Sequence, residues 1–412
     1  MMDTSGKHQN SAELQPVSGG VCAPRGFLAA GVHCGIKKEN GDLALLYSEV
    51  EARAAGVFTT NLVKAAPVLL TWERVRDGRL QAVVVNSGNA NACTGPLGME
   101  NAKLMARITA QELGLKEELV GVASTGVIGV PLPMNRVEKG IKQAVKELSP
   151  DGGTQAAKAI MTTDTCPKEV AVRVEVGGTL VTVGGMAKGS GMIHPNMATM
   201  LAFITSDARI DPGLLREVLK EAVERTFNMI TVDGDTSTND MVLMLNNGQA
   251  GNPEIKKRTP GYQVFSRAVE YVCTHLAKTI ARDGEGATKL LEVVVNGAAT
   301  TRDAQRAARA VAASNLVKTA VFGADANWGR VMCALGYSGA NFNPDKVGVW
   351  IGPVKVVEGG RAAQYNEEEA TRALQGQDVV LRVDLGVGNG QATAWGCDLS
   401  YDYVRINGSY RS

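Results

Sequence analysis

The sequence has few imidazole groups and almost no net charge. Four of its 412 residues are histidine, and 43 Lys and Arg residues balance 42 Asp and Glu residues to a net charge of +1. A chain without excess positive charge is not drawn to nucleic acid or to an anionic membrane surface, so neither is expected as a partner. Four histidines also leave few candidates for the general base of an enzyme.

Long apolar runs and paired cysteines are missing as well. No apolar run approaches the ~18 residues that a membrane span needs, and residues 1–18 lack the apolar core of a signal peptide. The seven cysteines contain no C-x-x-C pair, which argues against a disulfide framework or a zinc site. We therefore expect a soluble cytoplasmic protein with reduced thiols, no metal and a flexible tail over residues 1–18.

The pattern that is present alternates between strands and helices around a sizeable core. Residues 169–185 alternate apolar and polar side chains about a Gly-Gly turn, which predicts a hairpin. Residues 211–227 predict a helix with Asp211 as its N-cap. The pattern restarts near residue 289, so we expect an α+β protein with a larger domain over 19–287 and a smaller α/β domain over 288–412.

Three segments look like binding loops without meeting their requirements. GVGNG (386–390) lies between two expected strands, whereas a dinucleotide site needs a helix after its glycines. GGMAKGSG (184–191) has its lysine in the wrong place for a phosphate loop. DGDTSTND (233–240) lacks the glycine and the final glutamate of a calcium loop, and we interpret it as a polar loop without metal.

The segment AKGSGMIHPNMATMLAF (187–203) is the most informative one. It resembles the self-cleavage and nucleophile motif of the ornithine acetyltransferase family, the glutamate N-acetyltransferases of arginine biosynthesis. The resemblance continues in order along almost the whole chain, through STGVIG (124–129), MTTDT (161–165), TVDGDTSTND (231–240), DGEGATK (283–289), KTAVFGADANWGR (318–330) and INGSYRS (406–412). For the larger domain it implies a layered αββα sandwich.

The resemblance also implies that the chain cuts itself between Ala198 and Thr199. The Thr199 hydroxyl attacks the preceding carbonyl, the acyl group shifts from nitrogen to oxygen, and water releases the upstream chain. The freed α-amine has an ordinary pKa of about 7.7–8.0, so it can accept a proton at neutral pH and serve as the general base. An α-chain of residues 1–198 and a β-chain of residues 199–412 are then expected, assembled as two α and two β chains.

The expected reaction is a ping-pong acetyl transfer without a cofactor. Thr199 takes the acetyl group of N-acetylornithine, ornithine leaves, and glutamate attacks the acetyl-threonine ester. By the same resemblance the Thr125 hydroxyl and the Gly126 N–H form the oxyanion hole. Some family members also use acetyl-CoA and others do not, so acetyl-CoA as a co-substrate stays open.

Substrate binding is expected to involve both charges. Lys188 would bind a carboxylate and Glu285 an ammonium group, and the further contacts implied by the resemblance are Thr162, Asn407 and Ser412. Thr163 stays open as an alternative to Thr162. No role is assigned to Asn327, Trp328 and Arg330.

Two other functions remain open from the sequence. Self-processing aminopeptidases have a related fold and the same kind of nucleophile, so water as the acyl acceptor would make this protein a hydrolase. A non-enzymatic binding protein would need a defective nucleophile or oxyanion segment, and both segments are intact here.

Overall fold

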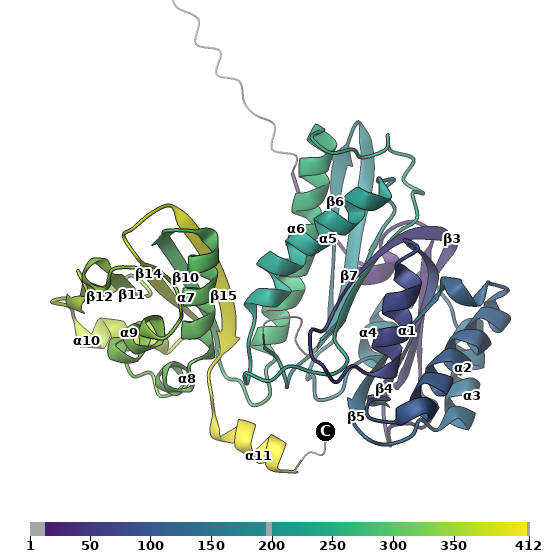
Figure 1. Cartoon of the computed structure of the whole chain (residues 1–412), viewed down its shortest axis with the longest axis horizontal. Coiled ribbons are helices and arrows are strands. Elements are labelled where there is room, and N and C mark those ends of the chain that lie inside the picture. The colour runs from purple at the N-terminus through teal and green to yellow at the C-terminus, as the bar shows by residue number, and fades with distance from the viewer. Residues whose placement is uncertain (1–12, 195–199, 410–412) are drawn as a thin grey trace, which may run out of the picture.

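The computed structural model describes residues 13–194 and 200–409, and their strands form two β-sheets (Figure 1). Within this part of the chain the larger sheet has nine strands in the order β1-β6-β7-β8-β9-β3-β4-β5, with β2 paired to β3. These strands are β1 (Gln15–Val17), β2 (Phe27–Val32), β3 (Leu43–Phe58), β4 (Arg79–Asn89), β5 (Val120–Val127), β6 (Lys168–Val176), β7 (Thr179–Lys188), β8 (Leu201–Ser206) and β9 (Met241–Asn246). Their helices are α1 (Ala66–Val75), α2 (Gly95–Leu113), α3 (Met134–Lys146), α4 (Gly153–Ala159), α5 (Pro212–Arg225) and α6 (Pro260–Arg282).

The larger sheet is bent so that its two halves face each other. Successive side chains of a strand point to opposite faces, so each strand contributes to two cores. Val83 of β4 packs in one buried cluster with Phe203 of β8, whereas Val84 packs with α2 and α3, and Ile204 packs with α5 and α6. The layers are therefore helices, half-sheet, half-sheet and helices, which confirms the expected α+β sandwich.

The smaller sheet has six strands within the described residues, in the order β13-β12-β11-β14-β10-β15. They are β10 (Leu290–Ala298), β11 (Gly348–Ile351), β12 (Val354–Glu358), β13 (Arg361–Ala362), β14 (Asp378–Asp384) and β15 (Gly390–Cys397). The helices are α7 (Thr301–Ala313), α8 (Asn315–Phe322), α9 (Trp328–Gly336), α10 (Glu367–Leu374) and α11 (Tyr401–Ser409). Figure 1 shows α11 running from the end of β15 back toward the larger sheet.

The local predictions can be compared with this architecture. The hairpin expected over 169–185 is the antiparallel pair β6–β7, and Asp211 caps α5 by accepting the Leu214 N–H at 3.0 Å. The tail expected over 1–18 was too long, because Gln15–Val17 pair with β6 as the edge strand β1. An edge position tolerates Pro16, which has no N–H to donate. No helix in the described part of the chain is long and apolar enough to cross a membrane.

Candidate functional site

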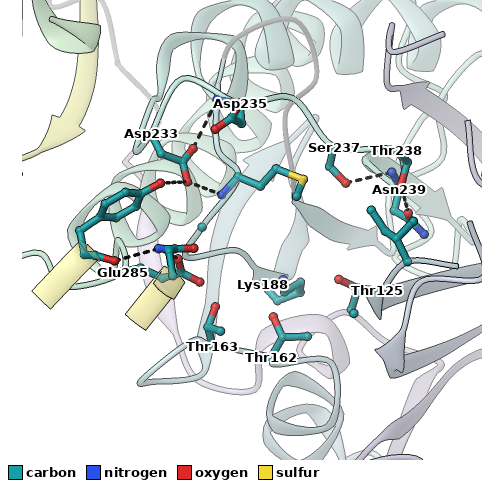
Figure 2. A pocket seen from close by; sticks show the side chains of 16 residues that line it. Thr125, Thr162, Thr163, Lys188, Asp233, Asp235, Ser237, Thr238, Asn239 and Glu285 are labelled. Atoms are coloured by element: carbon teal, nitrogen blue, oxygen red, sulfur yellow. Dashed lines mark hydrogen bonds between the residues drawn. The ribbon is translucent and has the colours of Figure 1, made fainter. Parts of the chain in front are cut away.

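A cavity lined mainly by polar groups lies at the ends of β5 and β7, next to α11. Its volume, measured as the space open to water-sized molecules, is about 220 Å³. In Figure 2 the side chains of Asp233, Asp235 and Glu285 gather on one side, Thr125 and Asn239 lie on the other, and Lys188 lies between them. The cavity thus has an acidic side, a central cation and a side with hydroxyl and amide groups.

Thr125 and Gly126 come from the last residues of β5, where it runs parallel to β4. Thr125 is buried and both residues line the cavity. Gly126 has φ +130°, and a Cβ there would lie 2.4 Å from the carbonyl carbon of Gly88. A side chain at position 126 would clash with the backbone of Gly88, so this position requires glycine. The arrangement is compatible with a backbone N–H donor at Gly126 next to the hydroxyl of Thr125.

Lys188 ends β7, and its side chain is 4% exposed. Its Nζ lies 3.9 Å from Oδ2 of Asp164, the same oxygen that accepts the Thr162 N–H at 2.9 Å. Burial lowers the pKa of Lys188, and the negative charge of Asp164 is the strongest influence in the opposite direction. Thr162 and Lys188 are thus held by one buried carboxylate at the wall of the cavity.

Glu285 follows α6 and is joined to α11 by a hydrogen bond. Nδ2 of Asn407 donates to Oε2 of Glu285 at 2.8 Å. Gly191 is packed against the same carboxylate, since a Cβ at Gly191 would lie 2.3 Å from Oε2. Because Gly191 has no side chain, the loop after β7 leaves room for the Glu285 carboxylate next to α11.

The segment 233–240, which we expected to be a polar loop, contributes to the wall of the cavity. Asp233, Asp235, Ser237, Thr238 and Asn239 all line the cavity. The Nδ2 of Asn239 also donates to the carbonyls of Ala90 and Ser124, at 2.6 and 2.8 Å, which ties the segment to the ends of β4 and β5. The segment matched the family pattern, but its sequence gave no indication of these distant backbone partners.

The same segment holds the chain on both sides of residues 195–199. Oδ2 and Oδ1 of Asp233 accept the N–H groups of Met192 and Ile193, at 2.6 and 2.8 Å. Met192 has φ 59°, a strained conformation for a side chain of this kind, which these bonds help to maintain. On the far side, Oδ1 of Asp240 accepts the Met200 N–H at 2.9 Å.

The titration of these aspartates reflects their burial. Burial raises the pKa of Asp233, while the N–H groups of Met192 and Ile193 act against it. Burial raises the pKa of Asp240 much further, well above its usual value, although the Met200 N–H and Lys188 oppose the change. The Asp240 carboxyl group next to Met200 therefore holds its proton more tightly in the folded protein than a free aspartic acid does.

The cavity brings together most of the residues expected from the sequence. Its lining includes Thr125, Gly126, Thr162, Lys188, Glu285 and Asn407, and it also includes the alternative, Thr163. The cleavage residues Ala198 and Thr199 and the expected contact Ser412 lie outside the described residues. Asn327, Trp328 and Arg330 are not part of the lining. Arg330 instead donates to the Leu316 carbonyl at 2.8 Å, which joins α9 to α8.

Fold and site together define an α+β sandwich protein with a cavity lined by carboxylates, a buried lysine, and hydroxyl and amide groups. A family model for the ArgJ family matches residues 28–412. The arginine biosynthesis bifunctional protein ArgJ of Symbiobacterium thermophilum is 62% identical over 403 residues, which is 97% of this chain and 100% of that protein. This chain belongs to the ArgJ family.

Two solved structures are also similar to parts of the chain. A chain of the arginine biosynthesis bifunctional protein ArgJ from Bacillus halodurans is 50% identical with a TM-score of 0.50, and the match covers 50% of this chain and 98% of that chain. A chain of the ornithine acetyltransferase from Mycobacterium tuberculosis, solved with ornithine, is 46% identical with a TM-score of 0.42, over 44% of this chain and 98% of that chain. The predicted family and enzyme class, an acetyltransferase of arginine biosynthesis, are confirmed.

Proposed function

We propose that the protein is a glutamate N-acetyltransferase that cuts itself between Ala198 and Thr199 and then moves the acetyl group of N-acetylornithine to glutamate through an acetyl-threonine ester. The observation that carries this proposal is the cavity itself. It gathers six residues that the family resemblance assigns to the oxyanion hole or to the substrate, although they come from five separate segments of the chain: Thr125, Gly126, Thr162, Lys188, Glu285 and Asn407.

The position of Met200 supports Thr199 as the nucleophile of this cavity. Met200 is bound to Asp240, and the next residue, Leu201, pairs with Lys188 in the β7–β8 ladder. The two residues that follow Thr199 in the sequence are thus anchored to Asp240 and beside the backbone of Lys188, a residue that lines the cavity.

The coverage of the solved ArgJ chain supports a cut near the middle of the sequence. Its match takes in 98% of that chain but 50% of this one. A relative that consists of two chains of similar length would give this result. Cleavage between residues 198 and 199 would divide the present chain into two such halves.

The proposed chemistry needs a nucleophile, a general base and an oxyanion hole. The freed amine of Thr199 takes the proton of the Thr199 hydroxyl, whose oxygen attacks the acetyl carbonyl. The Thr125 hydroxyl and the Gly126 N–H stabilise the oxyanion, and the intermediate collapses as the ornithine nitrogen takes up the proton and leaves. Glutamate then attacks the ester by the same steps in reverse.

The charges of the cavity fit an amino-acid substrate. Lys188 offers a buried cation for a carboxylate, and the side formed by Asp233, Asp235 and Glu285 offers negative charge for the ammonium group of ornithine. We further propose assembly as two α and two β chains, a cytoplasmic location, and acetyl-CoA as a second acetyl donor. The names of the relatives as bifunctional proteins support the last of these.

The test combines an assay with intact-mass spectrometry of the purified protein. The expected result is two chains, with the β-chain beginning at Thr199, and formation of N-acetylglutamate in step with ornithine release. A matched reaction without glutamate should stop after one acetyl group per active site. Acetate release at the same rate with and without glutamate would show a hydrolase instead, and a single uncut chain that transfers acetyl groups would refute the proposed nucleophile.

A further inference from the structure

Two buried lysines share one carboxylate at the wall of the cavity. Oδ1 of Asp164 accepts hydrogen bonds from Lys168 Nζ and from the Gly189 N–H, both at 2.7 Å. Oδ2 of Asp164 accepts the Thr162 N–H at 2.9 Å and lies 3.9 Å from Lys188 Nζ. Asp164 thus accepts its hydrogen bonds from other donors. Lys188 is attracted by the negative charge of Asp164 but does not donate a hydrogen bond to it.

Lys188 consequently keeps its N–H groups available. Its side chain is 4% exposed and lines the cavity, and its Nζ makes no hydrogen bond with another residue of 13–194 or 200–409. Removing an ammonium group from water without hydrogen bonds is costly. A carboxylate that entered the cavity would supply the missing acceptors.

The surrounding charges show which group keeps Lys188 protonated. Burial lowers its pKa, the positive charge of Lys168 acts in the same direction, and Asp164 is the strongest opposing influence, followed by Asp240 and Glu285. Lys37, which donates to the Met161 carbonyl at 2.9 Å, is a further cation close enough to affect Lys188. Of the acidic groups, Asp164 alone forms an ion pair with Lys188 within the described residues.

We propose that Asp164 is a positioning residue that keeps the Lys188 ammonium charged and directed into the cavity, so that its free N–H groups bind the carboxylate of an amino-acid substrate. Asp164 does not touch the substrate in this arrangement and acts through Lys188. The choice of an amino acid as the substrate rests on the proposed function. The charge relation between Asp164 and Lys188 rests only on the geometry given above.

The first test measures the protonation of Lys188 in the full-length protein without any substrate. Competitive labelling with acetic anhydride, followed by peptide mass spectrometry across a pH series, reports the pH at which Lys188 becomes reactive. In Asp164→Asn this midpoint should fall by about one pH unit or more, because a neutral amide replaces the main opposing charge. In Lys168→Gln it should rise, since a repelling cation is lost. An unchanged midpoint in both variants would overturn the inference.

The second test links this charge to the substrate. In calorimetric titrations with ornithine over a pH series, the affinity of Asp164→Asn should fall at a lower pH than the affinity of the wild type, by about the same shift as the labelling midpoint. Wild-type pH dependence in Asp164→Asn would count against the inference. A wild type that binds no ornithine, combined with a shifted labelling midpoint, would refute the proposed function and leave the role of Asp164 intact.

Asp283→Asn is the matched control for damage to the buried network. Oδ2 of Asp283 accepts a hydrogen bond from Lys168 Nζ at 2.5 Å, so this variant weakens the same network. Asp283 forms no ion pair with Lys188 within the described residues. The labelling midpoint of Lys188 should therefore change less than in Asp164→Asn. An equal change in the two variants would mean that general loosening, and not the charge of Asp164, controls Lys188.

Discussion

Asp240 and Met200 are joined by a buried hydrogen bond immediately after the predicted nucleophile. The Met200 N–H donates to Oδ1 of Asp240 at 2.9 Å. The second carboxyl oxygen, Oδ2, is buried without a hydrogen-bond partner among the described residues. Burial raises the pKa of Asp240 well above its usual value, so the folded protein retains a proton that the unfolded chain releases near pH 4.

This relationship predicts the pH dependence of stability. A carboxyl group with a raised pKa in the folded state costs stability as the pH rises above its unfolded pKa, because the unfolded state gains by ionising. Asp240→Asn removes that cost and keeps an amide oxygen for the Met200 N–H, so its advantage in free energy of unfolding should grow as the pH rises above about 4, the pKa of an unfolded aspartic acid. Urea unfolding in a Thr199→Ala background, where a single chain is expected, measures it. An advantage that stays constant with pH would contradict the assignment.

Cleavage should depend on the hydroxyl of Thr199. Thr199→Ala is expected to leave a folded, uncut and inactive chain, because the attacking oxygen is gone. Thr199→Ser keeps a hydroxyl and should still be cut, which makes it the matched control. Intact-mass spectrometry over several days distinguishes these outcomes, and circular dichroism checks the fold. A cut and active Thr199→Ala protein would rule out Thr199.

Thr125→Ala should reduce the rate of acetyl transfer more than the binding of substrate. The oxyanion forms in the transition state, so loss of one donor is expected to lower kcat by ~10²–10³ while KM changes little. Thr163→Ala is the matched control, because it removes a hydroxyl group of the same cavity to which no role in the oxyanion hole is assigned. Any effect of this variant should be on KM. Steady-state kinetics with N-acetylornithine and glutamate separate the two parameters. A Thr125→Ala effect confined to KM would assign Thr125 to substrate binding.

The sequence was informative wherever a residue acts within its own segment. The alternation about the Gly-Gly turn predicted β6 and β7, and Asp211 was recognised as the cap of α5 because its partner, Leu214, is three residues away. The strand β1 was missed because three residues that include a proline carry no strand signal of their own. Its structure comes from the partner strand β6, which lies far away in the sequence.

The residues of the candidate site also fall into two groups, those that could be recognised within their own segment and those that depend on distant partners. Lys188 and Glu285 could be assigned by resemblance because each lies in a distinctive glycine-rich segment. Asp164 and Asp240 received no role, since their function depends on backbone N–H groups and a lysine that folding brings to them. Patterns along the chain contain no information about such pairs until the order of the strands is known. The acidic segment 233–240 was therefore interpreted as a loop, although it lines the cavity.

Gly191→Ala should weaken substrate binding by moving Glu285. A Cβ at position 191 would lie 2.3–2.5 Å from the carboxylate atoms of Glu285, and the flexible end of that side chain can move away. The movement would break the 2.8 Å hydrogen bond from Asn407 and withdraw the charge from the acidic side of the cavity. Hydrogen bonds to charged groups contribute about 1.5–3 kcal/mol, so KM for N-acetylornithine should rise by about tenfold or more, with a smaller change in stability.

Gly336→Ala provides the matched control for this prediction. A Cβ at position 336, in α9, meets nothing within 4 Å, so the substitution adds the same methyl group without displacing a neighbour. Its KM should equal that of the wild type. If Gly191→Ala also kept the wild-type KM while remaining folded, the position of the Glu285 carboxylate would not matter for binding. The ammonium group of the substrate would then have to be bound by the other carboxylates of the cavity, Asp233 and Asp235.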